Sequence, residues 1–394
     1  MTQLNESGSA QQARCANAQQ LAHLLRASRT RTLALLDAYE AALGPRLPVP
    51  QWPTLNPSLW ELGHVAWYQE YWVGRNQQRA RGTGCDPLHA RTPSRTLNAD
   101  ALYDSGQVAH STRWSLALPD LTAIRTYLQA VLDETLTLLA TLPEHLQADD
   151  AALYFYRLVL FHEDMHAEAL VYSAQALGIP IPAELLGQPS RCKSNADALR
   201  VPAQVWQLGT KAEGFVFDNE LGAHSVALAA YEIDCGPVSW RRYLAFVEQS
   251  AGAVAVPRYL RRAGNGWECQ RFGDWNALDM DTPAVHLTQQ EAQAWCVWAG
   301  RTLPTEAQWE CAALTQTQFQ WGSVWEWTAS TFAPYPDFAP HPYLDYSQPW
   351  FGTHAVLRGA SVATSPRMAH PRYRNFFIPE RSDMHAGFRS ARVL

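Results

Sequence analysis

The sequence predicts a two-domain protein in which an N-terminal all-α four-helix bundle precedes a C-terminal α+β domain. Three observations lead to this fold class. The 394 residues exceed what one core usually holds. Apolar residues in the first half recur at helical spacing, whereas the second half has short apolar runs among many Gly, Pro and Trp residues. We place the bundle in residues 1–180, a linker in residues 181–202 and the second domain in residues 203–394.

Four segments of the first half have the amphipathic pattern of bundle helices. The first is expected to end at Gly44-Pro45, because proline cannot continue a helix, and the second to open at Asn56-Pro57, where an Asn cap precedes a proline suited to the first turn. A long polar stretch without periodicity, residues 75–118, separates the second and third helices, as in bundles with one long crossover connection. The expected helices cover residues 18–43, 56–73, 119–142 and 150–177.

Composition narrows the class of partner. The net charge is −6, 47% of residues are hydrophobic and 17% are charged, which is typical of a compact globular protein. This balance gives no electrostatic reason to expect nucleic acid or an anionic membrane as a partner. We therefore expect neither nucleic acid nor a membrane as a partner.

The cysteines and the N-terminus predict a cytoplasmic protein. Seven cysteines are scattered along the chain without a C-x-x-C pair, which favours reduced thiols over a disulfide framework or a structural zinc site. The first twenty residues are polar and lack the basic start and apolar run of a signal peptide. No stretch reaches the roughly 18 apolar residues that a membrane-spanning helix needs.

Two histidines of the fourth predicted helix form a candidate metal site. Leu158, His162, His166 and Leu170 are each four residues apart, so they share one helix face, and the imidazoles point into the bundle as the leucines do. Two neutral imidazoles at this spacing can chelate one divalent ion. Glu168, two residues after the second His, is the candidate for a second-shell acceptor.

A third ligand is expected from another inward helix face. Trp60, His64, Trp67 and Tyr71 form such a stripe on the second predicted helix, which makes His64 the best partner for His162 and His166. Alternatively, each of the three could be a core histidine with its own hydrogen bond. One metal accounts for three inward histidines more economically than three separate partners do. Three His ligands suit zinc as well as iron, and the spacing alone does not choose between them.

The motifs around these histidines resemble a known family. W-x-L-G-H-V-A-W-Y-x-E at residues 60–70 and H-E-D-M-H-A-E at residues 162–168 resemble the DinB-like bundle of the iron-dependent sulfoxide synthases, which make ergothioneine and ovothiol and include a branch that makes selenoneine. G-R-T-L-P-T-E-A-Q-W-E at residues 300–310 and A-G-F-R at residues 386–389 resemble the formylglycine-generating-enzyme-like domain, a C-type-lectin-like fold. The two resemblances together cover nearly the whole chain. They imply an enzyme that uses Fe(II) and O2 to join sulfur or selenium to the imidazole C2 of hercynine.

The resemblance also implies roles for individual residues. It assigns Fe(II) to His64, His162 and His166. Residues 343–347 resemble the family's Tyr-x-x-Tyr-Ser loop, in which the first tyrosine is the active-site proton donor; that tyrosine is Tyr343. Residues expected to bind substrate are Tyr346 and Phe376, as a cation–π wall for the quaternary ammonium, Asn375 for the carboxylate, and Phe377, Arg381 and Met165. We assign Trp325-Glu326-Trp327 to the core.

Departures from the family pattern bear on the donor. Enzymes that use γ-glutamylcysteine carry an acidic residue where Phe377 stands, and only Arg381 keeps a place resembling the donor-binding arginine. Met165 stands where some members have a glutamine that touches substrate. Residues 98–114 resemble the selenoneine branch, whose donor is a selenosugar without carboxylates. We expect this donor, with cysteine or γ-glutamylcysteine as the alternative.

Other classes of function remain open at this point. A zinc-dependent DinB-type thiol transferase would use the same three histidines. A non-catalytic lectin-like protein with a structural metal is a further possibility. A sulfatase-activating activity needs a C-terminal cysteine pair, and no cysteine follows Cys311.

Overall fold

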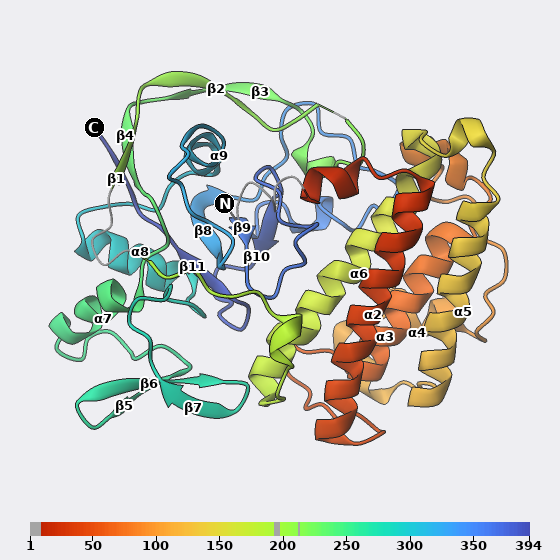
Figure 1. Ribbon diagram of the computed structural model, residues 1–394, viewed down its shortest axis with the longest axis horizontal. Helices are drawn as coiled ribbons and strands as arrows, with labels where there is room; N and C mark the ends of the chain where they lie inside the picture. The colour runs from red at the N-terminus through yellow and green to blue at the C-terminus, as the bar shows by residue number, and fades with distance from the viewer. Residues whose placement is uncertain (1–8, 193–197, 212) are drawn as a thin grey trace.

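The structure confirms the predicted fold class. The protein is described by a computed structural model that covers residues 9–192, 198–211 and 213–394. In Figure 1 the long helices of the first half lie together on one side, and the strands and short helices of the second half lie on the other. Within the part of the chain so described, none of the helices combines the length and apolarity required to span a lipid bilayer.

Four helices form the bundle, and their positions agree with the predicted segments. Helices α2, α5 and α6 each start at a side-chain cap, supplied by Asn17, Asp120 and Asp149, whose oxygens accept from backbone N–H groups that lack a partner inside the helix. Helix α3, the second of the four along the chain, runs directly into a π-helical turn, η1. Such turns are often found near functional sites. The bounds are α2 Ala18–Leu43, α3 Ser58–Gln69, η1 Glu70–Gly74, α5 Leu121–Ala140 and α6 Asp150–Leu177.

The crossover between α3 and α5 is ordered by short helices and a buried carboxylate. It contains η2 Arg79–Gly84, α4 Ala99–Tyr103 and η3 His110–Ser115, none of which has a periodicity visible in the sequence. Glu70 of η1 accepts hydrogen bonds from the Ser94 hydroxyl at 2.5 Å, the Arg95 backbone N–H at 3.0 Å and the Tyr127 hydroxyl at 2.6 Å. These bonds tie the crossover and α5 to the end of α3. The turn η4 Glu144–Leu146 then leads into α6.

The C-terminal half is built around a four-stranded sheet with the order β10-β9-β8-β11. Strands β8 and β9 are antiparallel with Trp325 opposite Gly359, whereas β11 runs parallel to β8. Trp325 and Trp327 of β8 are buried, as predicted for the core. The strands are β8 Val324–Thr331, β9 Ala355–Ala360, β10 Asn375–Phe377 and β11 Ala386–Phe388.

Smaller sheets and three helices complete this half. Strands β1, β4 and β12 form one sheet, β2 and β3 a two-stranded ribbon, and β5, β6 and β7 an antiparallel three-stranded sheet. The strands are β1 Ala198–Val201, β2 Gln204–Leu208, β3 His224–Leu228, β4 Tyr231–Asp234, β5 Leu260–Ala263, β6 Gly266–Arg271, β7 Asp274–Ala277 and β12 Ala391–Val393. The helices are α7 Trp240–Gln249, α8 Gln289–Trp298 and α9 Glu306–Thr315, with the short turns η5 Ala183–Leu185, η6 Asp218–Glu220 and η7 Gln348–Trp350.

The predicted linker is partly structured. Four of its residues, Ala198–Val201, form β1, which pairs with β4 along its whole length. Before them, the Gly187 N–H donates to the Val362 carbonyl at 2.7 Å, so this stretch packs on the C-terminal half. Residues 193–197 of the predicted linker lie outside the described residues. The domain bounds themselves stay a prediction.

Helix α6 joins the two halves through a polar face. Asp164 accepts from Arg367 at 2.5 Å, Glu168 accepts from Trp325 at 2.7 Å, and the Gln175 amide donates to the Gln270 carbonyl at 2.9 Å. Residues 164, 168 and 175 are separated by four and seven positions, which places them on one side of the helix. The structure therefore uses one side of α6 for the bundle and another for the C-terminal half.

Candidate metal centre

Three imidazoles meet between α3 and α6. The Nε2 atom of His162 lies 3.2 Å from Nε2 of His64 and 3.1 Å from Nε2 of His166. The ligand atoms of the three histidines all lie within 4.8 Å of one another, and no other such group of three or more ligating residues occurs among the described residues. The structure thus brings together the three residues that the helical spacing selected.

The hydrogen bonds of the outer ring nitrogens fix which atoms face the centre. Nδ1 of His64 lies 2.8 Å from the carbonyl oxygen of Tyr103, which can only accept, and Nδ1 of His166 lies 2.6 Å from the Glu61 carboxylate. Both Nδ1 atoms therefore carry a proton, which in a neutral ring leaves the lone pair on Nε2, the atom that faces the centre. Oriented acceptors of this kind are typical partners of metal-bound histidine.

The centre has more lone pairs than protons, which fits a cation. Burial lowers the pKa of His162 well below its ordinary value, so its ring is neutral near pH 7 and carries one proton. When all three rings are neutral, that proton can serve at most one of the two lone pairs that face its Nε2 atom. A divalent ion would satisfy all three nitrogens of the neutral rings, whereas hydrogen bonds alone would leave at least one of them without a partner.

Glu61 and Asn56 extend the support of His166. One Glu61 oxygen accepts from His166, and the other accepts from the Asn56 amide at 2.6 Å. Burial alone would raise the pKa of Glu61, but the charge and hydrogen bond of His166 outweigh it and lower this pKa to about 2. Burial also lowers the pKa of His64 to about 3. The site therefore combines a carboxylate held in its charged form with two imidazoles, those of His64 and His162, held neutral.

Gly63 explains how the crossover reaches His64. A Cβ atom at Gly63 would lie 2.2 Å from Cε1 of Tyr103, so only glycine lets the Tyr103 ring pack directly on α3. The same tyrosine supplies the carbonyl that accepts from His64. In the Leu-Gly-His sequence of α3, the histidine faces the metal centre. The glycine before it leaves room for Tyr103, whose carbonyl orients that histidine.

Aromatic rings enclose the centre on two sides. Tyr68 stacks on His162 with ring centroids 3.5 Å apart and planes at 6°, and Trp60 stacks on His64 at 5.1 Å and 8°. Tyr343, from the loop that follows β8, meets Tyr68 edge to face at 5.0 Å and lies 6.5 Å from the His162 ring. A loop of the C-terminal half therefore reaches the metal-facing side of the bundle.

Comparison with known proteins agrees with both halves of this architecture. The model of the DinB superfamily matches residues 24–170, and that of the Sulfatase-modifying factor enzyme 1-like domain matches residues 184–323 and 319–394. Hercynine oxygenase from Mycolicibacterium smegmatis is 30% identical over 448 residues, an alignment that covers 94% of this chain and 98% of that protein. The chain belongs to the hercynine oxygenase family.

Two further relatives differ in how much of this chain they match. Hercynine oxygenase from Mycobacterium tuberculosis is 28% identical over 443 residues, which cover 95% of this chain and 98% of that protein. The formylglycine-generating enzyme of Streptomyces coelicolor is 24% identical over 307 residues, which cover 55% of this chain and 96% of that protein. The likeness to hercynine oxygenases thus extends over both halves.

In this hercynine oxygenase family member, Tyr346 and Tyr373 connect the tyrosine loop to Met165. The Tyr346 hydroxyl lies 3.2 Å from that of Tyr373, which donates to the Met165 sulfur at 3.5 Å. Tyr346 also stacks on Phe217 at 4.7 Å and lies 6.0 Å from the Phe376 ring. These contacts bring Tyr346, Phe376 and Met165 of the predicted substrate set into one aromatic cluster beside Tyr343.

Residues 218–220 hold the tyrosine loop, residues 343–347, in place. Asp218 accepts from the Ser347 hydroxyl at 2.5 Å, and Asn219 donates to the same hydroxyl at 3.0 Å. Glu220, two residues on, forms a buried bidentate pair with Arg14 at 2.7 and 2.8 Å. The loop that carries Tyr343 and Tyr346 therefore rests on a buried polar anchor.

The other residues of the predicted substrate set differ in the contacts that they already make. These residues are Asn375, Phe377 and Arg381. The Asn375 side-chain oxygen accepts from the Phe376 backbone N–H at 2.9 Å, which leaves its amide group to donate. Arg381 forms a bidentate pair with Asp383 at 2.6 and 2.9 Å and lies over the Phe377 ring, 4.6 Å from its centroid. The positive charge of Arg381 is thus already matched by a carboxylate of its own chain.

Glu168 does not have the contacts predicted for a second-shell acceptor. Its carboxylate accepts from Trp325, from the Ser361 hydroxyl at 2.8 Å and from the Thr364 hydroxyl at 2.9 Å, all in the C-terminal half. The physical reason is helical geometry, because two residues correspond to about 200° of rotation, which turns Glu168 away from the face of His166. Glu61 has the predicted contacts instead.

Three supporting residues escaped the sequence prediction, namely Glu61, Tyr103 and Tyr68. Glu61 lies three residues before His64, on the same face of an otherwise apolar helix, and this spacing could have identified it. The contribution of Tyr103 comes from its backbone carbonyl, for which side-chain chemistry gives no signal. The stacking of Tyr68 on His162 depends on the crossing of α3 and α6.

Proposed function

We propose that this protein is an iron(II)-dependent, O2-using oxidoreductase that forms a carbon–selenium or carbon–sulfur bond at the imidazole C2 of hercynine. The observation that carries the proposal is the convergence of three imidazoles, two of them oriented by acceptors, in a member of the hercynine oxygenase family. His64, His162 and His166 would hold the iron. Iron(II) bound by three histidines keeps open positions and supplies the chemistry of O2 activation.

Tyr343 is the proposed proton donor. Its ring lies 6.5 Å from the ring of His162, and burial raises the pKa of its hydroxyl to about 12, so the phenol keeps its proton near pH 7. A group that retains its proton until the reaction demands it can act as a general acid. The polar anchor beneath the loop supports this role, because it fixes the tyrosine that must reach the reacting atoms.

The aromatic cluster beside Tyr343 is the proposed site for the trimethylammonium group of hercynine. A quaternary ammonium has no hydrogen-bond donor and is best held by ring faces. Tyr346 and Phe376 lie 6.0 Å apart with their planes at 74°, so they form two adjoining walls. The free Asn375 amide would donate to the substrate carboxylate, and Met165 would close the cluster on the side of α6.

The proposed donor is a selenosugar. A γ-glutamylcysteine donor brings two carboxylates, which need unpaired cations in the pocket. Phe377 carries no charge, and the guanidinium of Arg381 is paired with Asp383. A site with little free positive charge here favours a neutral donor. Cysteine or γ-glutamylcysteine as donor, and zinc-dependent thiol transfer at the same histidines, are the alternatives that the experiment must separate.

Anaerobic reconstitution with Fe(II), followed by hercynine, O2 and each donor in turn, tests the proposal through product mass. A hercynine adduct formed with the selenosugar, and not with cysteine or γ-glutamylcysteine, is the expected result. Adducts with the thiols alone would retain the iron chemistry and reject the selenium donor. Thiol transfer with zinc in the absence of O2, or no adduct from any donor despite bound iron, would overturn the proposal.

A further inference from the structure

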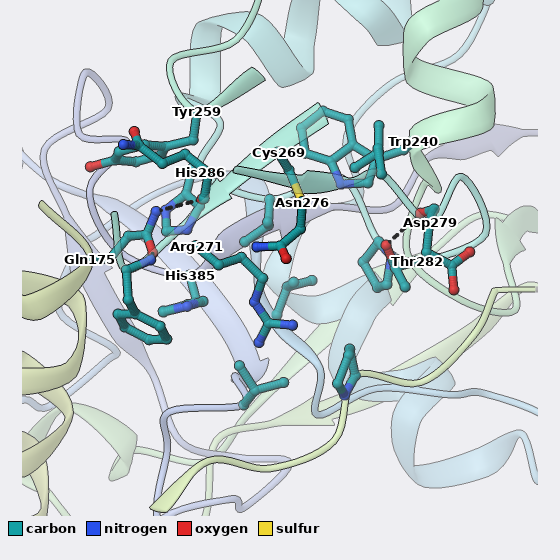
Figure 2. Close-up of a pocket in the computed structure, with 18 of the residues that line it drawn as sticks. Gln175, Trp240, Tyr259, Cys269, Arg271, Asn276, Asp279, Thr282, His286 and His385 are labelled. Carbon is teal, nitrogen blue, oxygen red and sulfur yellow. Dashed lines mark hydrogen bonds between the residues drawn. The ribbon is translucent and has the colours of Figure 1, made fainter. Parts of the chain in front are cut away.

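A second pocket lies in the C-terminal half and includes none of the residues proposed for the metal or for hercynine. It has a volume of about 510 Å³ and lies between the β5-β6-β7 sheet, the loop around His286, the residue before β11 and the end of α6. Figure 2 shows Trp240, Tyr259, His286, His385 and Asn276 around the same space, with Arg271 extending into its middle. Volumes of this order are typical of small-molecule sites.

Three side chains in this pocket have polar atoms without a partner. The Tyr259 hydroxyl and the Nδ1 atoms of His286 and His385 are all buried, and none has a hydrogen-bond partner among the described residues. Tyr259 is 8% exposed and His286 is 6% exposed. The three rings form a row. The His286 ring centroid lies 4.8 Å from that of Tyr259 and 4.8 Å from that of His385. A buried polar atom without a partner is unfavourable, so three neighbouring ones indicate a site that can bind a polar ligand.

The backbone at His286 is a second sign of a built site. Its φ is +61°, a left-handed conformation that is uncommon outside glycine. Flanking backbone bonds hold it there, from Ala284 N–H to the Val238 carbonyl at 2.9 Å and from Leu287 N–H to the Ala386 carbonyl at 3.1 Å. Strained conformations of this kind collect at ligand sites because they aim a side chain that a relaxed backbone would turn away.

The charge of the pocket selects the class of ligand. Arg271 has no ion-pair or hydrogen-bonded side-chain partner within the described ranges, whereas the acidic residue on the pocket wall, Asp279, is paired with Arg191 at 2.8 Å. The pocket thus has the exposed guanidinium of Arg271, which lacks an ion-pair partner in the described ranges, beside a buried phenol and two imidazoles that burial keeps neutral by lowering their pKa. The two imidazoles do not belong to any group of three metal-ligating residues in the described chain, so a metal with three protein ligands is not favoured here.

We propose that this pocket binds a small organic anion, with a carboxylate or phosphate-monoester group at Arg271 and an apolar body against Trp240 and Phe272. Arg271 supplies the charge, since guanidinium groups pair well with both kinds of oxyanion. The Tyr259 hydroxyl can donate, and each imidazole can donate in the tautomer that carries its proton on Nδ1. Trp240, Phe272 and the aliphatic wall supply the apolar surface.

The pocket is also tied to the helix that carries His162 and His166. The Gln175 amide of α6 donates to the Gln270 carbonyl at 2.9 Å and accepts from the Phe272 N–H at 2.8 Å. This pair of bonds fixes the β6–β7 turn, and Arg271 with it, against α6. The anion site is therefore expected to be formed before the ligand arrives.

Titration of the full-length protein with 4-fluorobenzoate and with 4-fluorophenyl phosphate, followed by ligand ¹⁹F NMR, tests the proposal. Neutral 4-fluorobenzyl alcohol is the uncharged probe. Arg271→Gln removes the proposed anion partner, and Arg261→Gln is the matched control, because Arg261 belongs to the same small sheet, is paired with Glu268 and does not line the pocket. The His162→Ala variant reports binding at the three histidines.

We expect saturable binding of at least one anion by the wild type, by Arg261→Gln and by His162→Ala. Arg271→Gln should weaken it by about tenfold or more, as expected for a lost charge-assisted hydrogen bond, and the alcohol should bind comparably weakly. The tighter of the two anions identifies the acid group. Equal affinity in Arg271→Gln and wild type, binding that disappears in His162→Ala, or no saturable binding of either anion would overturn the proposal.

Discussion

The helical bundle and the C-terminal half bury their polar groups in different ways. In the bundle, the long helices pack through apolar stripes, and buried charges lie at several separate places, among them the Arg29–Glu163 pair, 2.7 Å apart, Glu70 and Arg157. In the C-terminal half, strands of three to eight residues alternate with irregular segments, and fully buried Arg–Glu pairs recur between them. These pairs are Arg358–Glu310, Arg374–Glu306 and Arg389–Glu326.

The difference suggests a division of labour. Helices are stiff supports that hold three imidazoles at a fixed spacing, whereas the loops of the C-terminal half can carry substrate-facing residues once buried charges anchor the backbone. Stability in the bundle should thus depend on packing and in the other half on matched charges. Metal affinity should depend on the bundle, and turnover should depend on both halves.

The largest expected effect is on stability, at a buried pair of the C-terminal half. Arg389→Met leaves Glu326 buried without its cation, and breaking a buried pair in this way costs about 3–5 kcal/mol. Urea unfolding of the variant measures the loss. The control is Arg392→Met, whose partner is Glu232 and whose side chain is 55% exposed, and which should cost less than about 1 kcal/mol. Similar losses in the two variants would contradict the proposed role of the buried pairs.

The next effect is on turnover, at the tyrosine loop. Tyr343→Phe removes the proposed proton donor and should lower kcat about 100-fold or more, the usual contribution of a general acid, while iron affinity stays unchanged. Tyr346→Phe, in the same loop, loses only its contact with the Tyr373 hydroxyl and keeps its ring. Its kcat should therefore fall far less. Full activity in Tyr343→Phe would reject the assignment.

A third effect is on metal affinity. It compares a carboxylate that contacts the metal-facing side of α6 with one that α6 directs toward the C-terminal half. Glu61→Gln weakens the acceptor of His166, and loss of such a partner typically lowers metal affinity about 10–100-fold. Glu168→Gln makes the same chemical change on the face toward the C-terminal half and should leave iron affinity unaltered. Anaerobic competition with a chelator measures both. A larger loss in Glu168→Gln than in Glu61→Gln would restore the original sequence prediction.

The smallest expected effect concerns the donor. Because Arg381 is already paired with Asp383, Arg381→Gln should change the KM of the selenosugar by only a few-fold. An arginine that binds a donor carboxylate would contribute about 1.5–3 kcal/mol, or roughly tenfold or more in KM. Steady-state kinetics with the selenosugar and with γ-glutamylcysteine distinguishes the two cases. A tenfold rise in the KM of γ-glutamylcysteine would show that Arg381 binds a donor carboxylate and would favour that donor.

How much could be predicted from sequence differed between the halves for a physical reason. The bundle helices were found because burial of one face imposes a period of 3.6 residues, and the same period selected His64, His162 and His166. Strands of three residues such as β10 and β11 are too short for any periodicity to show, so that half was predicted only as a class.

The errors at the site have a related cause. Glu168 was chosen for its nearness in sequence to His166, but nearness along a helix is not nearness in space, and the intervening angle sends it to the other half of the molecule. The supporting partners of the histidines come from Glu61 on another helix and from the Tyr103 carbonyl of the crossover. Neither partner can be placed before the packing of α3 and the crossover is known.

X-ray absorption at the iron edge of the anaerobically loaded protein tests the central claim most directly. One iron per chain, with three imidazoles at about the 2.0–2.2 Å range of metal–nitrogen bonds, is the predicted result, together with loss of the iron in His162→Ala while the fold persists. Iron bound with fewer than three imidazoles, or retained in His162→Ala, would contradict the proposed centre.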